Sequence, residues 1–365
     1  MSIIVNQILG IRKAKEKLPF LYNEPAIIYP PALNLEQSSS EITGNLKQHE
    51  LVKLLNSIPV AKAVDLTGGF GIDSYFLSKL SLDFDYVEPD ADLLEVARHN
   101  HSTLGITNIK YHNSNAETYL ATLNYPLNFA FVDPSRRAAG NKKVFKLSEC
   151  EPNIAQVQDA VFQHTDILVI KTSPLLDISI ALAEINFVSK VIVVSVENDC
   201  KELLLVSTKG FQGNPLIKTV NVRKSETEIF EYQPEDEHRA EVAYSQPLVF
   251  LYEPNASIMK AGAFKLTGVQ YGLKKLHQNT HLYTSEKFVL EFPGRVFRIL
   301  HSLKADVKLM KELLPEGKAN VTTRNYPLTV EEIKKKFGIK DGGNRYVIGY
   351  TDIKTKGLLL AERLK

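Results

Sequence analysis

Apolar and polar residues follow two different periods along the middle of the chain. Short apolar runs, typical of buried strands, are separated by segments whose apolar positions recur every three to four residues, as in amphipathic helices. The apolar runs lie at 61–66, 84–88, 109–112, 128–132, 166–170 and 190–196, and the helical segments at 72–80, 90–104, 115–123, 151–164 and 175–187. Regular alternation of strand and helix predicts an α/β fold with a doubly wound parallel sheet.

The pattern changes on both sides of this alternation. Residues 1–55 are predicted to form an N-terminal helical cap, with a break at Pro30 and Pro31. After residue 196, the apolar runs 203–206 and 217–222 follow with short connections, which predicts an antiparallel edge. The acidic segment 233–239 predicts a boundary, followed by two small α+β regions. We therefore expect four domains, at 1–55, 56–238, 239–294 and 295–365.

The charge is distributed unevenly. The 365 residues carry a net charge of +2, but residues 295–365 hold 16 Lys/Arg against 8 Asp/Glu, a net charge of +8. A domain-sized basic region favours nucleic acid as a partner, although a solvated basic face without a ligand is the alternative.

Composition narrows the function classes further. The two cysteines, Cys150 and Cys200, indicate neither a disulfide framework nor a cysteine-based zinc site, and they favour a reducing cytosol. The histidines are scattered, and we expect the pair His99 and His101 at the surface, so no metal site is predicted. The apolar runs are too short to span a bilayer. The sequence predicts a soluble, cytoplasmic protein.

The most informative motif is the glycine-rich segment Asp65-Leu-Thr-Gly-Gly-Phe-Gly71, between a predicted strand and a predicted helix. Glycines at such a turn let the backbone approach a ligand closely, and the start of the helix offers unpaired N–H groups. Glu88 ends the next apolar run, 23 residues after Asp65. A carboxylate at that place accepts hydrogen bonds from ribose hydroxyls. The spacing suits NAD and S-adenosylmethionine (SAM) equally.

Polar residues after the third and fourth strands separate these two ligands. Asn115-Ala116-Glu117 follows the third run and Asp133-Pro134 the fourth. A dinucleotide site usually needs G-x-G-x-x-G against a pyrophosphate, whereas this chain has Ser74 at the last glycine position. A rim formed by Asp65, Glu88 and Asp133 suits the sulfonium cation of SAM. A dinucleotide enzyme, or a doubly wound domain that uses these residues only in turns and caps, remains the alternative.

At these four places the chain resembles class I SAM-dependent methyltransferases. More specifically, Asp133-Pro-Ser-Arg-Arg137, Tyr252–Gly262, Leu276–Tyr283, Phe292–Phe297, Asn325–Leu328 and Lys340–Gly343 resemble a bacterial methyltransferase family that carries a ferredoxin-like unit and then a THUMP-like domain. The resemblance implies that 239–294 is the ferredoxin-like unit and 295–365 the THUMP-like domain. It also implies SAM as cofactor and RNA as partner, because THUMP domains proper serve tRNA-modifying enzymes.

The resemblance assigns roles to individual residues around the cofactor. It implies that Gly68, Gly69 and Gly71 hold the methionine part of SAM, with Asp65 beside them, and that Glu88 holds the ribose. Ala116 and Glu117 would contact the adenine, and Asp133 would lie nearest the sulfonium and the acceptor.

A basic segment follows the predicted fourth strand. Five positive charges occur between residues 136 and 146, with no carboxylate until Glu149. Such a loop could neutralise phosphates beside a target nucleotide, and an aromatic ring in it could stack on a base. We expect the substrate to be bound by Arg136, Arg137, Lys142, Lys143 and Phe145. For a single arginine, a structural ion pair with Asp133 is an equal alternative.

The acceptor atom is left open. Enzymes that methylate exocyclic amines often have Asp/Asn-Pro-Pro-aromatic where this chain has Asp133-Pro134-Ser135-Arg136, so amine methylation here needs another aromatic ring or another acceptor. Ribose 2′-O-methyltransferases of the Lys-Asp-Lys-Glu type place four residues as Lys47, Asp133, Lys171 and Glu202 lie here. A lysine with a depressed pKa could assist deprotonation of a hydroxyl. Alternatively, Lys171 pairs with Asp133.

From these features we predict a SAM-dependent methyltransferase that acts on RNA, either rRNA or tRNA, at a base or ribose atom. Asp133, Pro134 and Lys171 are the expected catalytic residues, and Lys47 is expected to contact substrate. A SAM-binding, RNA-associated module without turnover, or an enzyme for a small acceptor, is the second possibility.

Overall fold

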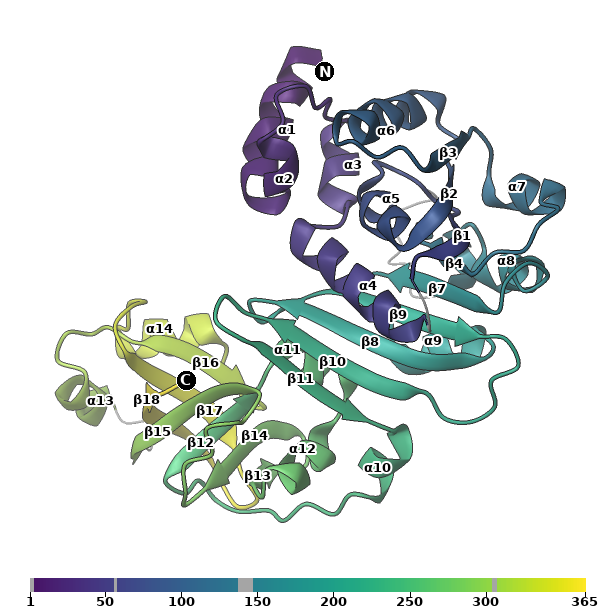
Figure 1. Cartoon of the computed structure of the whole chain (residues 1–365). Coiled ribbons are helices and arrows are strands. Elements are labelled where there is room, and N and C mark those ends of the chain that lie inside the picture. Colours follow the sequence, from purple (N-terminus) through teal and green to yellow (C-terminus); the bar gives the residue numbers. More distant parts are fainter. Residues whose placement is uncertain (1–2, 56–57, 137–146, 304–306) are drawn as a thin grey trace. The chain divides into compact units, whose positions relative to one another are not determined.

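The computed structural model describes residues 3–55, 58–136, 147–303 and 307–365 (Figure 1). The chain divides into two compact units. The first consists of Met1–Ile192 with Lys201–Pro215, and the second of Val193–Cys200 with Leu216–Lys365.

The first unit contains a largely parallel sheet with the strand order β9-β7-β4-β1-β2-β3. Its strands are β1 (Val60–Asp65), β2 (Ser81–Val87), β3 (Ile109–His112), β4 (Phe129–Val132), β7 (Ile167–Thr172) and β9 (Asp199–Thr208). All neighbours are parallel except β7 and β9. The parallel strands are mostly buried apolar runs, as expected for a sheet that is covered on its faces.

The helices between these strands occur where the periodicity predicts them. They are α5 (Ile72–Leu77), the short 3₁₀ turn Ser78–Leu80, α6 (Ala91–Thr103), α7 (Ala116–Thr122), α8 (Ile154–Val161) and α9 (Ile178–Glu184). Two two-residue strands, β5 (Ser135–Arg136) and β6 (Cys150–Glu151), and a 3₁₀ turn at Leu147–Glu149 lie between β4 and α8. The predicted doubly wound α/β fold is confirmed.

The strand that contains the apolar run 203–206, β9, does not lie at the edge of the sheet, where the sequence predicted it. β8 (Val188–Val196) neighbours β9, and β9 lies between β8 and β7 instead of at the margin. The turn between β8 and β9 consists of Glu197 and Asn198, both at positive φ, as in a two-residue type I′ hairpin. This order also departs from the 3-2-1-4-5-6 order of dinucleotide-binding sheets, because an antiparallel strand is inserted after the fifth parallel one.

The N-terminal cap packs on the glycine-rich turn. It comprises α1 (Ile3–Lys17), α2 (Pro19–Tyr22), α3 (Ala32–Gln37) and α4 (Glu41–Leu54). A capping box formed by Ser40 and Thr43 starts α4. Cap residues including Leu18 and Leu35 share one buried cluster with Phe70 and Phe76. Burial of this apolar surface keeps α3 and the segment before α4 beside the carboxyl end of β1.

The second unit contains the antiparallel pair β10 (Leu216–Val222) and β11 (Thr227–Tyr232), with the end of β8 beside β10. A seven-stranded sheet follows with the order β13-β14-β12-β15-β18-β17-β16. Its strands are β12 (Phe250–Pro254), β13 (Lys274–His277), β14 (Thr280–Ser285), β15 (Gly294–Leu303), β16 (Asn320–Arg324), β17 (Arg345–Thr351) and β18 (Lys356–Arg363). The pair β16 and β17 is parallel.

The described residues of the second unit form five helices: α10 (Pro234–Arg239), α11 (Ala256–Ala261), α12 (Phe264–Gln270), α13 (Val307–Leu313) and α14 (Val330–Phe337). The acidic segment predicted as a boundary forms α10, inside this unit. Ile333 and Phe337 of α14 pack with Val347 and Leu358 in one core. The limits of the four predicted domains stay a prediction.

Candidate functional site

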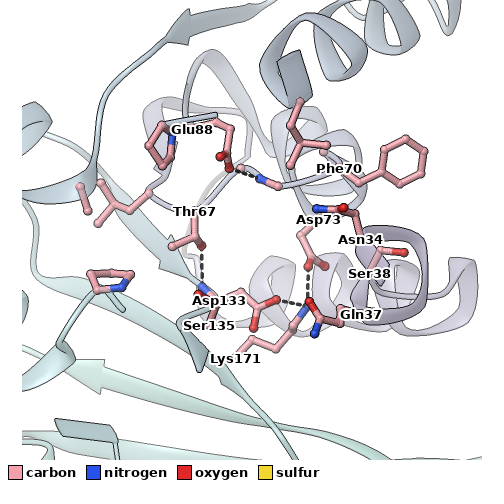
Figure 2. Close-up of a pocket in the computed structure, with 18 of the residues that line it drawn as sticks. Asn34, Gln37, Ser38, Thr67, Phe70, Asp73, Glu88, Asp133, Ser135 and Lys171 are labelled. Carbon is pink, nitrogen blue, oxygen red and sulfur yellow. Dashed lines mark hydrogen bonds and ion pairs between the residues drawn. The ribbon is translucent and has the colours of Figure 1, made fainter. Parts of the chain in front are cut away.

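A cavity of about 400 Å³ opens at the carboxyl ends of β1, β2, β4 and β7 (Figure 2). This volume is in the range of small-molecule sites, and the carboxyl edge is where open α/β sheets bind ligands. Its wall consists of residues from the cap, the glycine-rich turn and the strand ends: Asn34, Gln37, Ser38, Ser39, Leu66, Thr67, Gly68, Gly69, Phe70, Gly71, Ile72, Asp73, Glu88, Pro89, Leu93, Asn115, Ala116, Glu117, Asp133, Ser135, Glu151, Pro152 and Lys171.

Asp65 holds the glycine-rich turn through hydrogen bonds on both of its carboxylate oxygens. One carboxylate oxygen accepts hydrogen bonds from the amide and hydroxyl of Thr67, at 3.0 and 3.3 Å, and the other accepts from Ser74 at 2.6 Å. The side chain is buried and is not among the wall residues. Burial raises the pKa of Asp65 to about 7, against the lowering effect of the hydrogen bonds from Ser74 and Thr67. Asp65 therefore shapes the turn at the edge of the cavity.

Two positions of the turn require glycine, one because of a close contact and one because of its backbone conformation. A Cβ on Gly68 would lie 2.3 Å from the ring of Tyr86, and Gly71 has a φ of +84° in front of α5. The amide of Gly69 donates to Glu88 at 2.8 Å, and its carbonyl accepts from the hydroxyl of Tyr86 at 2.5 Å. The turn is thus tied to β2 and leaves its backbone exposed to the cavity.

His101 corrects the expectation of a surface pair. Its ring is buried, and Nε2 donates to the carbonyl of Gly71 at 2.8 Å while Nδ1 accepts from the hydroxyl of Tyr111 at 3.0 Å. Burial lowers the pKa of His101 to about 4, so the ring is neutral at pH 7. The sequence pattern did not identify it, because its partner Gly71 lies 30 residues away.

Glu88 and the start of α7 form the next part of the wall. The Glu88 carboxylate accepts from the amides of Gly69 and Asp90, at 2.8 and 2.9 Å, and burial raises its pKa. These bonds hold the carboxylate in place and leave further lone pairs for a ligand. Asn115 caps α7 through the Thr118 amide, which places Ala116 and Glu117 on the wall.

Asp133 and Lys171 lie on the opposite side of the cavity from Glu88 (Figure 2). The amide of Asp133 donates to the Thr67 hydroxyl at 2.7 Å, and its carboxylate pairs with the Lys171 ammonium at 2.6 Å. The Asp133 side chain is 35% exposed and that of Lys171 is 8% exposed. Burial raises the pKa of Asp133, and Lys171 opposes that effect. The pairing that the sequence left open is therefore present.

The ion pair continues inward as a line of alternating charges. Lys171 also contacts Asp73 at 2.9 Å, Asp73 contacts Lys47 at 3.1 Å, and Lys47 contacts Glu202 at 2.7 Å. Burial by itself lowers the pKa of Lys171. The carboxylates of Asp133 and Asp73 outweigh burial and raise this pKa well above its usual value. Burial raises the pKa of Asp73, but the positive charges of Lys171 and Lys47 have the larger effect and hold the pKa of Asp73 well below its usual range.

Ser39 joins this line to the cap. Its hydroxyl donates to Asp73 at 2.9 Å and accepts from the ammonium groups of Lys47 and Lys171, at 3.0 and 3.1 Å. A hydroxyl has one donor and two acceptor positions, so all three are used. Lys171 also contacts Asp73 and Asp133, and Lys47 also donates to both carboxylate oxygens of Glu202. Each lysine thus serves three acceptors, which uses the three N–H groups of an ammonium cation.

The predicted tetrad is thus brought together, but only half of it reaches the cavity. Asp133 and Lys171 are wall residues, whereas Lys47 has an exposed fraction of 0% and lies behind Asp73 with Glu202. Sequence reasoning missed Ser39 and Asp73, which hold the four together. It also missed Asn34 and Gln37 of α3, which line the same cavity (Figure 2).

The predicted substrate loop is only partly described. Ser135 and Arg136 pair with Glu151 and Cys150 in a short antiparallel bridge between β5 and β6. Arg137, Lys142, Lys143 and Phe145 lie outside the described residues. Among the described residues, no cluster of His, Cys, Asp and Glu is arranged to hold a metal ion, and no helix is long and apolar enough to cross a membrane.

The raised pKa of Asp65 gives a testable pH dependence. Because the folded-state pKa of about 7 lies above the ordinary value of 3.8, the folded state holds this proton more tightly. We therefore expect the Asp65 contribution to stability to fall between pH 4 and pH 7, by at most about 4 kcal/mol. Urea unfolding of wild type and Asp65→Asn at pH 5 and pH 8 measures it. Equal pH dependence in both proteins would contradict the assignment.

Comparisons with known proteins agree with this architecture. Family models match a ferredoxin-like domain at residues 250–293 and a THUMP domain-like region at residues 294–363. A search of curated proteins gave no significant match. Two similar crystal structures are described as putative methyltransferases. The one from Porphyromonas gingivalis W83 is 28% identical with a TM-score of 0.89, and the match covers 100% of this chain and 90% of that protein.

The other such structure, from Streptococcus mutans in complex with SAH, is 16% identical, with a TM-score of 0.34, over 44% of this chain and 94% of that one. An rRNA methylase from Streptococcus thermophilus is 16% identical, with a TM-score of 0.35, and the match covers 46% of this chain and 95% of that one. These two likenesses are too distant to bear on the activity of this chain. The Porphyromonas match and the two family models confirm the resemblance predicted from the sequence: the chain has a methyltransferase-type fold followed by a ferredoxin-like and a THUMP-like domain.

Proposed function

We propose that this protein is a SAM-dependent methyltransferase that acts on RNA, at a base or ribose atom. The observation that carries the proposal is the charge of the cavity. Its described wall holds five carboxylates, Asp73, Glu88, Glu117, Asp133 and Glu151, against one cation, Lys171. Such a wall favours a cationic sulfonium ligand and disfavours the pyrophosphate of a dinucleotide.

The wall residues fit the parts of SAM in order. Glu88, held by two backbone amides, would accept the ribose hydroxyls, and Ala116 with Glu117 would border the adenine. Gly68, Gly69 and Gly71 would hold the methionine part, with Asp65 setting the conformation of their turn. When bound, SAM would supply an electrophilic methyl group beside Asp133.

The contribution of the protein to methyl transfer is mainly positional. Asp133 is aimed by the Thr67 hydroxyl at its amide and by the Lys171 ammonium at its carboxylate, and Pro134 rigidifies the backbone after it. An ionised Asp133 could accept a hydrogen bond from an acceptor group. Lys171 is held as a cation between two carboxylates, so it is poorly suited to remove a proton from a ribose hydroxyl. Lys47 would act through Asp73, without touching substrate.

Two features support RNA as the substrate. The THUMP domain-like match covers residues 294–363, and the region from 295 to the end has the net charge of +8 given above. The basic residues at 136–146 follow Asp133 directly along the chain, and they would contact phosphates beside the target nucleotide. The acidic cavity wall would admit a base or a sugar more readily than a phosphate.

Two measurements test the proposal. Calorimetry with SAM tests the cofactor, and transfer of a labelled methyl group from SAM to bulk RNA tests the reaction. We expect SAM binding and RNA labelling. Binding without labelling of RNA would favour the second possibility, a SAM-binding module or an enzyme for a small acceptor. Absence of SAM binding would reject the proposal.

The basic region gives a prediction of its own. Lys335, Lys336 and Lys340 are exposed residues of the THUMP-like region. Replacing all three by serine is expected to weaken RNA binding roughly tenfold and to flatten its dependence on salt, because fewer counterions are released. Filter binding between 50 and 200 mM salt measures both. The matched control replaces the exposed Lys15, Lys53 and Lys110 of the first unit; an equal effect of the two triple variants would contradict the assignment.

A further inference from the structure

The line of buried charges does not balance. It contains three carboxylates, Asp133, Asp73 and Glu202, and two ammonium groups, those of Lys171 and Lys47. Each lysine faces three acceptor atoms, which matches the three N–H groups of an ammonium cation. With the carboxylates ionised, the line carries one excess negative charge.

Two of the three carboxylates, Asp73 and Asp133, line the cavity, and Asp133 is the more exposed of the two. Glu202 is buried and receives both of its hydrogen bonds from Lys47. Asp73 lies between the two lysines and also accepts from Ser39. Among the side chains that the structure describes, Asp133 forms an ion pair with Lys171 alone, and its own side chain is 35% exposed on the cavity wall. The unbalanced charge is therefore presented to the cavity mainly by Asp133, the more exposed of these two carboxylates.

No other described cation neutralises this end of the line. Lys17 is the next lysine that interacts electrostatically with Lys171 and Asp73, but its ammonium donates to the carbonyls of Leu35 and Glu36, and it is not a wall residue. The other described acidic wall residues, Glu88, Glu117 and Glu151, add negative charge. A ligand that brings a positive charge next to Asp133 would complete the balance.

We propose that Asp133 makes the cavity select the charge state of its ligand, so that the cationic donor SAM binds more tightly than its neutral product S-adenosylhomocysteine (SAH). This inference rests on the proposed function and goes beyond it. In methyl transfer the acceptor atom forms a bond to the methyl carbon while the bond from sulfur to that carbon breaks. The sulfur keeps the electron pair of the broken bond and becomes neutral, and the proton of the acceptor leaves to water. The balance at Asp133 is then lost in the same step, which favours release of the product.

The size of the effect is set by the surroundings of Asp133. Lys171 already compensates part of its charge, and solvent reaches its side chain. A full ion pair in a dry site is therefore excluded, and we expect wild-type protein to bind SAM about tenfold more tightly than SAH. A tenfold ratio corresponds to about 1.4 kcal/mol.

Calorimetric titration of the full-length protein with SAM and with SAH tests the proposal without knowledge of the RNA substrate. Asp133→Asn is expected to weaken SAM binding about tenfold and to change SAH binding less than twofold, so that the preference disappears. Unchanged SAH affinity also shows that the variant is folded. Asp159→Asn, at an exposed position on α8, is the matched control for loss of one negative charge, and it should keep the wild-type ratio.

A third ligand separates the charge from the methyl group. An analogue with an ammonium group in place of the methylated sulfur should bind wild type as SAM does and lose the same factor in Asp133→Asn.

The outcomes are distinct. Equal or tighter binding of SAH by wild type overturns the charge selection and leaves the proposed cofactor intact. Equal weakening of SAM and SAH in Asp133→Asn overturns it as well, since Asp133 would then act only on the shape of the site. If neither SAM nor SAH binds, both the proposed function and this inference fail.

Discussion

Replacing Asp133 by alanine is expected to lower methyl transfer to RNA at least about 100-fold at saturating SAM. The carboxylate lies at the carboxyl end of β4, on the cavity wall, with its amide fixed by Thr67 and its side chain by Lys171. Loss of one aligned polar group at a reacting centre costs a factor of this order. Because the variant also weakens SAM binding, the rate is measured with labelled SAM at several concentrations and extrapolated to saturation.

The fold of the Asp133→Ala variant must be monitored separately. A third of the Asp133 side chain is exposed, so the melting temperature should change little, although Lys171 loses one partner and keeps Asp73. Asp159→Asn is again the matched control and should keep the wild-type rate. A wild-type rate in Asp133→Ala would remove this residue from the mechanism.

The second large effect concerns stability. Lys47→Met is expected to lower the free energy of unfolding by about 3–5 kcal/mol, because removal of one partner leaves uncompensated charges in the interior. Lys47 is fully buried, and its ammonium is the partner of Glu202 and one of two cationic partners of Asp73. Urea unfolding at pH 7, followed by circular dichroism, measures the change.

Two further variants show whether the loss comes from the buried charges. Lys53→Met, in the same helix α4 but with a side chain that is 46% exposed, should change stability by less than about 1 kcal/mol. The double variant Lys47→Met/Glu202→Gln should recover part of the loss, because it also removes the unpaired carboxylate. If Lys47→Met lowered the free energy of unfolding by less than about 1 kcal/mol, the ion pairs of Lys47 would not be needed for stability.

The line of charges connects the cap to the cavity wall. Ser39 precedes α4, Lys47 belongs to α4, and both contact Asp73 at the start of α5. Lys171, from β7, then contacts Asp133. The N-terminal cap therefore contacts a lysine of the cavity wall, through Ser39 directly and through Lys47 by way of Asp73. Through these contacts α4 and the segment before it belong to the site, although they precede the first strand.

Much of the site could be predicted because it depends on local order along the chain. The glycine-rich turn, Glu88, Asn115 and Asp133 each follow a strand, and parallel strands end at the same edge of a sheet. Their convergence around one cavity required no knowledge of packing. The ligand contacts of Asp65, Gly68, Gly69, Gly71, Ala116 and Glu117 stay predictions, as do those of the basic loop.

The sequence by itself determined the alternation of strands and helices, the position of the glycine-rich turn and the basic C-terminal region. Each of these features depends only on residues that are close together along the chain. Only the tertiary structure decided that β9 enters beside β7, that His101 is buried under Gly71, and that Lys47 meets Glu202 across 155 residues of chain. The reason is physical: a local period fixes which face of an element is buried, whereas the partner of a buried charge is chosen by packing between distant segments.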